Sequence, residues 1–152
     1  MPARGPVTRR LWTEAEPFDF HGTHHRLAGA YGSPKPVQRP YPPILIGGRS
    51  AALLRVVAAH ADLWNIPGGD IADAASRSAL LDRYCAEIGR DPATITRSIH
   101  LPVSYDQPGA TRAAVSAAVD AGFGHIVLGL STPYPPDVAR WVADEFIIST
   151  PS

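Results

Sequence analysis

The chain has 152 residues, of which 45% are hydrophobic, and its acidic and basic side chains balance to a formal net charge of zero. This length supports one domain with a real core, and the neutral charge gives no electrostatic reason to expect nucleic acid or an anionic membrane as a partner. No apolar run approaches the roughly 20 residues of a membrane-spanning helix, and the first residues lack the apolar stretch of a secretory signal. The single cysteine, Cys85, excludes an internal disulfide, so we expect a cytoplasmic protein.

Residues 1–42 are predicted to form an extended, proline-rich arm. Proline fixes φ and disfavours helix in the residue before it, so the segment PKPVQRPYPP at 34–43 should be extended. The segment EPFDFHGTHHRL at 16–27 should form a strand and a turn, and no clear helix is expected in this region. Its histidines lack an accompanying cysteine or an H-E-x-x-H pattern, so no metal site is predicted at His21, His24 and His25.

Residues 43–152 repeat a strand followed by a helix four times. The predicted strands are short and apolar, and they lie at 44–46, 61–66, 97–105 and 125–130. Helices with one apolar face should follow, beginning near Ser50, Asp70, Gly109 and Pro136. Alternating strands and helices indicate a parallel sheet. Four such units fit half of a (β/α)8 TIM barrel, because a complete barrel takes about 250 residues, or a small doubly wound sheet.

The first strand ends in Gly47 and Gly48, and Arg49 and Ser50 follow. Glycines let the backbone bend and be approached closely, and the free N–H groups of the next helix's first turn carry partial positive charge. That arrangement binds phosphate, with Arg49 and Ser50 as further donors. A tight turn with Ser50 as the helix cap needs the same residues, so both interpretations stay open. The G-x-G-x-x-G pattern and the P-loop lysine are absent, so no Rossmann or nucleoside-triphosphate site is predicted.

Few other residues point to chemistry. Trp64 and Asn65 lie near the C-terminal end of the second strand, where barrel enzymes place their active sites, so both are candidates for a substrate pocket. Trp64 can equally fill the core. His100 lies in mid-strand and faces either a barrel lumen or the outer helices. Cys85 falls on the apolar face of a helix and should be core. No G-x-S-x-G elbow is found, and no catalytic residue is predicted.

Four segments, in this order and spacing, resemble the C-terminal half of the luciferase-like monooxygenase family: FDFHGTHHRL, PKPVQRPYPPILIGG, AAHADLWN and CAEIGRDPATITRS. The nearest members use the 8-hydroxy-5-deazaflavin coenzyme. The resemblance covers the chain from about Arg10 and implies a (β/α)8 barrel with its cofactor at the C-terminal ends of the strands. It implies that Gly47, Gly48, Arg49 and Ser50 receive the phosphate of a deazaflavin or of FMN. The implied chemistry is hydride transfer or monooxygenation on a small organic substrate.

The resemblance also implies a missing part, because family members contain an N-terminal barrel half with most of the contacts to the cofactor ring. We expect either a truncated reading of a longer gene, which is favoured, or a piece that pairs with another chain, or a remnant that self-associates. Half a barrel leaves two open strand edges, and little activity is expected from this chain alone. The alternative function is a non-catalytic half-barrel that self-associates or binds phosphate-bearing ligands.

Overall fold

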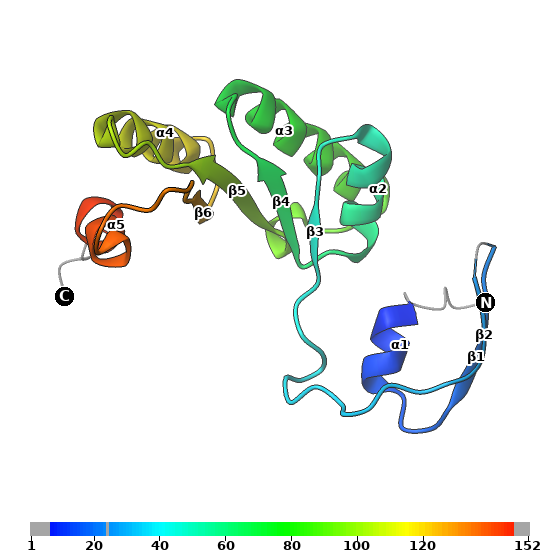
Figure 1. The fold of residues 1–152 in the computed structure, drawn as a ribbon. Helices are drawn as coiled ribbons and strands as arrows, with labels where there is room; N and C mark the ends of the chain where they lie inside the picture. The colour runs from blue at the N-terminus through cyan, green and yellow to red at the C-terminus, as the bar shows by residue number, and fades with distance from the viewer. Residues whose placement is uncertain (1–6, 24, 148–152) are drawn as a thin grey trace. The chain divides into compact units, whose positions relative to one another are not determined.

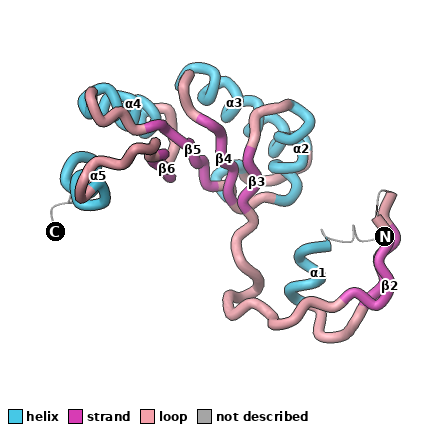
Figure 2. Tube along the Cα trace, viewed as in Figure 1, coloured by secondary structure: helices cyan, strands magenta, loops and turns pink. Residues whose placement is uncertain are grey.

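The computed structural model describes residues 7–23 and 25–147 of the chain (Figures 1 and 2). The chain divides into two compact units, Met1–Pro43 and Ile44–Ser152. Within the described ranges, no helix is both long enough and apolar enough to cross a membrane.

The first unit contains a short helix and a two-stranded antiparallel sheet: α1 (Val7–Thr13), β1 (Phe18–His21) and β2 (Arg26–Ala30). β1 falls in the segment 16–27 that was predicted to form a strand and a turn, whereas β2 begins at its end and extends beyond it. The expectation of no clear helix is wrong. Arg10 forms an ion pair with Glu14 four residues later, and its guanidinium lies 3.8 Å from the centre of the Phe18 ring. These contacts stabilise a helix too short to persist by itself. The predicted absence of a metal site involves His24, which lies outside the described residues.

The second unit has the four predicted strand–helix pairs. The strands are β3 (Leu45–Gly47), β4 (Leu63–Pro67), β5 (Thr96–Pro102) and β6 (His125–Gly129), and the helices are α2 (Ala51–His60), α3 (Ile71–Glu87), α4 (Pro108–Asp120) and α5 (Val138–Phe146). A 3-10 turn, η1 (Pro92–Thr94), precedes β5. All strands are parallel and are neighbours in chain order. A doubly wound sheet reverses its strand order at a switch point. This sheet does not, so it is a partial barrel and not the doubly wound alternative.

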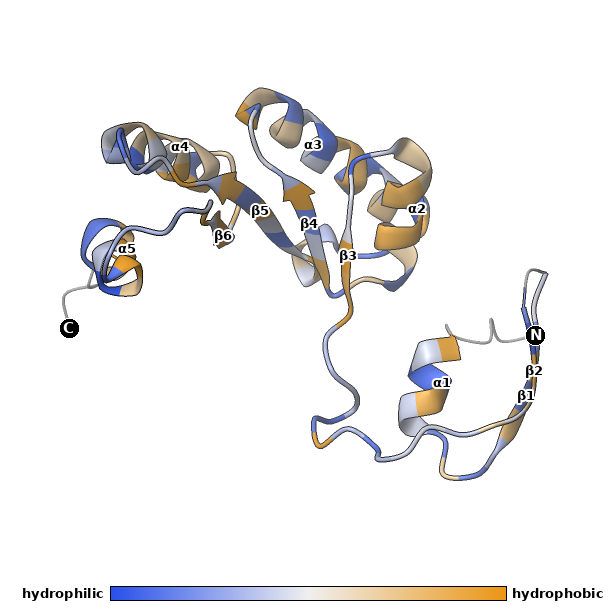
Figure 3. Cartoon of the chain, in the orientation of Figure 1, coloured by the Kyte–Doolittle hydropathy of each residue, from blue (hydrophilic) through white to orange (hydrophobic). Residues whose placement is uncertain are grey.

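One face of the sheet carries the core. Every second strand residue points to this face, and Figure 1 shows α2, α3 and α4 along it. The strand side chains packed there are Ile46, Trp64, Ile66, Ile99, Leu101, Ile126 and Leu128, and the helices contribute Leu54, Val57, Leu81, Cys85 and Ala118. In Figure 3 most of α2 is orange, the colour of hydrophobic residues, whereas orange and blue segments alternate along α3. Cys85 is fully buried, as its position on an apolar helix face predicts.

The alternate strand residues point to the opposite side of the sheet, which we call the open face. It is made up of Leu45, Gly47, Leu63, Asn65, Pro67, Thr96, Ser98, His100, Pro102, His125, Val127 and Gly129. Most of these residues are exposed or half-buried, and Ser98 is the buried exception. The structure thus resolves the open question about His100, which faces this side and not the helices.

The segment EIGRDP ends α3 and supports α2. Gly89 has φ +69° directly after the end of α3, as expected of a glycine that terminates a helix. The Arg90 guanidinium donates to the carbonyl oxygens of Ala58 and Ala61 at 2.9 and 2.7 Å, which satisfies the last turn of α2. These contacts are structural.

Candidate functional site

The turn between β3 and α2 lies at the C-terminal edge of the parallel sheet, and Gly48 shapes it. Gly48 has φ +137°, a conformation that side chains other than glycine rarely adopt. A Cβ at this position would also lie 2.3 Å from Cδ2 of Leu53. The Gly48 N–H donates to the carbonyl oxygen of Asn65 at 2.9 Å, which ties the turn to β4. Gly48 is therefore required by the turn itself, with or without a ligand.

Gly47 differs from Gly48 because the turn does not require it. Its φ is not in the left-handed region, and an added Cβ would meet only the carbonyl oxygen of Asn65, at an ordinary 3.7 Å. The residue is exposed on the open face. Its missing side chain therefore leaves room for something outside this chain to approach the backbone.

Ser50 is the N-terminal cap of α2. Its hydroxyl oxygen accepts a hydrogen bond from the Leu53 N–H at 3.3 Å. Helix geometry leaves the N–H groups of Ala51 and Ala52 without intrahelical acceptors. The N-terminus of α2 thus presents two backbone donors and the positive end of a helix dipole beside Gly47.

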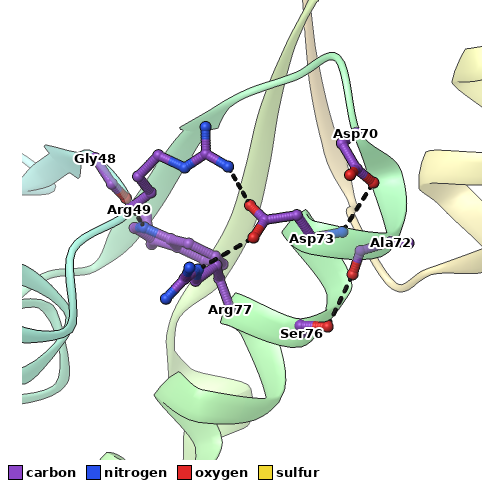
Figure 4. A network of polar contacts seen from close by, with 8 residues as sticks. Gly48, Arg49, Asp70, Ala72, Asp73, Ser76 and Arg77 are labelled. Atoms are coloured by element: carbon purple, nitrogen blue, oxygen red, sulfur yellow. Dashed lines mark hydrogen bonds and ion pairs between the residues drawn. The ribbon is translucent and has the colours of Figure 1, made fainter.

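Arg49 points away from the turn toward α3, as Figure 4 shows. Its guanidinium forms an ion pair with Asp73, which also accepts a hydrogen bond from Arg77 Nε at 3.3 Å. The pKa of the Asp73 carboxyl lies below its usual range, mainly because the Arg49 guanidinium donates a hydrogen bond to it. Asp70 caps α3 by accepting from the Asp73 N–H at 3.0 Å. Two guanidinium groups share the Asp73 carboxylate, and Asp70 adds a second negative charge beside it, so the four charges balance.

Sequence reasoning did not find Asp73 and Arg77. Their spacing of four residues on one helix was visible as a helix-surface pair. The link to Arg49 was not, because that residue is on a different element. Only the packing of α2 against α3 brings these groups together.

Trp64 lies in the core. Its side chain is fully buried and packs against the Phe123 ring, with the ring centroids 6.2 Å apart. The indole N–H donates to the Gly48 carbonyl oxygen at 2.8 Å. Of the two alternatives for Trp64, the structure shows the core one, and the pocket assignment does not fit the buried ring. Trp64 therefore contributes to the site by holding the glycine turn from the core side of the sheet.

Asn65 lies on the open face and begins a hydrogen-bonded row across three strands. Its Nδ2 donates to the Ser98 hydroxyl at 2.8 Å, and that hydroxyl lies 2.7 Å from Nδ1 of His125. These residues are register neighbours, and Gly47 pairs with Asn65 at the other end of the row. Nothing in the sequence pattern indicated Ser98 and His125, because the register between strands decides which residues meet.

The family model of the luciferase-like monooxygenases matches residues 6–145. The chain belongs to the luciferase-like monooxygenase family. A curated relative, the FMNH(2)-dependent dimethylsulfone monooxygenase of Pseudomonas putida, is 27% identical over an alignment of 147 residues that covers 90% of this chain and 39% of that protein.

Solved structures show the same fold at low sequence identity. An F420-dependent secondary alcohol dehydrogenase in complex with an F420-acetone adduct superposes with a TM-score of 0.69 at 18% identity, over 88% of this chain and 55% of that one. The coenzyme F420 dependent tetrahydromethanopterin reductase of Methanopyrus kandleri gives 0.73 at 13% identity, over 93% of this chain and 60% of that one. The chain therefore spans about two fifths to three fifths of the length of these family members.

Proposed function

We propose that this chain supplies the phosphate-binding part of a flavin-type cofactor site, in an oxidoreductase that acts on a small organic substrate. The cofactor is a deazaflavin coenzyme or FMN, in line with the relatives that are named as F420-dependent and FMNH(2)-dependent. The rest of the ring pocket would come from a barrel half outside this chain. When bound, such a cofactor supplies hydride-transfer or oxygenation chemistry.

The observation that carries the proposal is the β3–α2 turn. An anion seated over Gly47 would face the free N–H groups of Ala51 and Ala52 at the positive end of α2. The Arg49 and Arg77 guanidinium groups are paired with Asp73, and Asp70 lies beside it, so their charges balance and the backbone N–H groups carry the site. The Ser50 hydroxyl accepts one bond as a cap and can still donate its proton to a phosphate oxygen. The residues present therefore fit a phosphate group.

In the same proposal, Asn65 lines the substrate side of the pocket. It lies beside Gly47 on the open face, and its amide is oriented by the Ser98 hydroxyl. Trp64 holds the Gly48 carbonyl from the core and does not line the pocket. The chain itself binds the phosphate, orients it against α2 and fixes the height of the cofactor over the sheet.

The test compares two ligands that differ only in the phosphate. We expect the folded chain, alone or joined by the N-terminal half of a relative, to bind FMN more tightly than riboflavin, measured by quenching of flavin fluorescence. Gly47→Val should weaken FMN binding by about tenfold, or about 1.4 kcal/mol, and leave riboflavin binding unchanged. Valine suits a strand, so the fold should persist.

Gly124→Val is the matched control, because Gly124 also has an ordinary φ and open space around its Cβ position but lies before β6, away from the turn. It should leave both affinities unchanged. Equal affinity of the wild type for FMN and riboflavin would refute the phosphate site. Tight binding of FMN and of unrelated phosphate esters alike, without any redox activity, would favour the non-catalytic phosphate-binding module.

A further inference from the structure

Asn65 lies near the C-terminal edge of the open face, where few side chains are polar. The open-face residues that end the four strands are Gly47, Pro67, Pro102 and Gly129. Two residues earlier in each strand lie Leu45, Asn65, His100 and Val127. Among these residues, Asn65 and His100 are the ones with polar side chains. Because barrel enzymes bind their ligands at this edge, the way in which Asn65 presents its amide decides what the site can recognise.

The Ser98 hydroxyl has two partners, and together they fix the direction of each hydrogen bond. Nδ2 of Asn65 can only donate, so the Ser98 oxygen accepts this bond at 2.8 Å. The one proton of the hydroxyl is then left for Nδ1 of His125, which lies 2.7 Å away. Ser98 is fully buried and has no third partner among the described residues, so a proton directed elsewhere would be buried without an acceptor.

This order of protons determines which atoms stay free at the two ends of the row. His125 accepts at Nδ1, so its neutral ring carries the proton on Nε2. At the other end, Nδ2 of Asn65 is directed at Ser98, and Oδ1 makes no hydrogen bond with a described residue. A flipped amide would direct Oδ1 at Ser98, and the hydroxyl would then face two acceptors with one proton. The row therefore holds the amide in one orientation.

We propose that Ser98 and His125 are positioning residues, which hold the Asn65 amide so that its carbonyl oxygen is offered to the substrate. An acceptor at this place selects a small organic molecule that carries a hydroxyl or amino group, because such a group donates to Oδ1 and a ketone does not. The inference rests on the proposed function for the placement of a substrate beside Asn65. The order of protons in the row is independent of any cofactor.

The first experiment locates the proton on His125 by ¹⁵N NMR of the chain with labelled histidines. In the wild type, the neutral ring should carry it on Nε2. Asn65→Asp replaces Nδ2 by an oxygen that only accepts, so Ser98 must donate to the new carboxylate and accept from His125. The proton should therefore appear on Nδ1. His60 is the internal control, because it ends α2 on the covered side of the sheet, and its signals should not change.

Two further backgrounds test whether the Ser98 hydroxyl transmits this effect. With Ser98→Ala the hydroxyl is absent, so adding Asn65→Asp should leave the proton on Nε2. With Ser98→Thr the hydroxyl is kept and threonine suits a strand, so the proton should move as it does with serine. Circular dichroism checks that each variant is folded. A proton that moves equally with and without the hydroxyl would overturn the inference, and so would a wild-type ring with its proton on Nδ1.

The second experiment tests the consequence for binding. The chain, joined by the N-terminal half of a relative and loaded with FMN, is titrated with sec-butanol or butanone while the flavin absorption is followed. The alcohol should bind roughly tenfold more tightly, because the ketone leaves Oδ1 of Asn65 without a donor. Ser98→Ala should lose this preference, and Ser98→Thr should keep it.

The outcomes separate this inference from the proposed function. Tighter binding of butanone would overturn the selection of a donor and leave the phosphate site standing. Equal affinity of the wild type for FMN and riboflavin would overturn the phosphate site, whereas the proton position on His125 would still report the order of the row.

Discussion

The hydrogen bond from the Trp64 indole to the Gly48 carbonyl connects the core to the candidate site, and Trp64→Phe tests that connection. The substitution keeps an aromatic ring against Phe123 but removes the N–H that donates at 2.8 Å. The lost hydrogen bond should cost about 1–2 kcal/mol, and the smaller ring in a fully buried position should cost about 1–2 kcal/mol more. The expected loss of stability is therefore roughly 2–4 kcal/mol.

The assay has two readouts that separate the contributions. For a domain of this size about 1 kcal/mol corresponds to roughly 4 °C in Tm, so thermal unfolding followed by circular dichroism should show Tm falling by about 10 °C. The space left by the smaller ring and the lost hydrogen bond both lower Tm. Only a displacement of the Gly48 turn changes the proposed phosphate site. We therefore also expect weaker FMN binding with unchanged riboflavin binding at a temperature where the variant is folded.

Trp141→Phe is the matched control, because Trp141 lies in α5, where it packs edge-on against Tyr105 and Phe146, and not at the β3–α2 turn. Its effect should be confined to a modest fall in Tm. The reasoning is refuted if Trp64→Phe lowers Tm as expected but binds FMN like the wild type, since the indole would then not hold the turn. An unchanged Tm would contradict the burial argument as well.

Two further predictions concern titratable groups. The pKa of Asp73 is lowered from an ordinary value of 3.8, so its ion pairs stabilise the fold above that pH and lose their effect as the pH falls through the lowered pKa. Asp73→Asn should therefore be less stable than the wild type at neutral pH in urea unfolding, and the difference should shrink below 3.8; a pH-independent difference would contradict the ion pair. Burial raises the pKa of the Cys85 thiol, so iodoacetamide should modify it only after unfolding, and rapid labelling of the native chain would contradict its core position.

Local signals in the sequence predicted most of the second unit. The four strand–helix pairs follow from short apolar runs and helical periodicity, which depend on neighbouring residues only. Ser50 caps α2 and Gly89 ends α3 as their chemistry requires. The α1 helix escaped prediction because its support comes from Glu14 and the Phe18 ring, which both lie outside the helix.

The sequence by itself determined the parallel strand–helix order, the glycine turn and the burial of Cys85, because each depends on residue type and short spacing. Tertiary structure decided the rest. The contact of Arg49 with Asp73 requires α2 to pack on α3. The hydrogen-bonded row from Asn65 to His125 requires the register of three strands. The orientation of His100 depends on which face of the sheet the helices cover. Such contacts join residues distant in the chain, and no local pattern specifies which of many alternatives the packing selects.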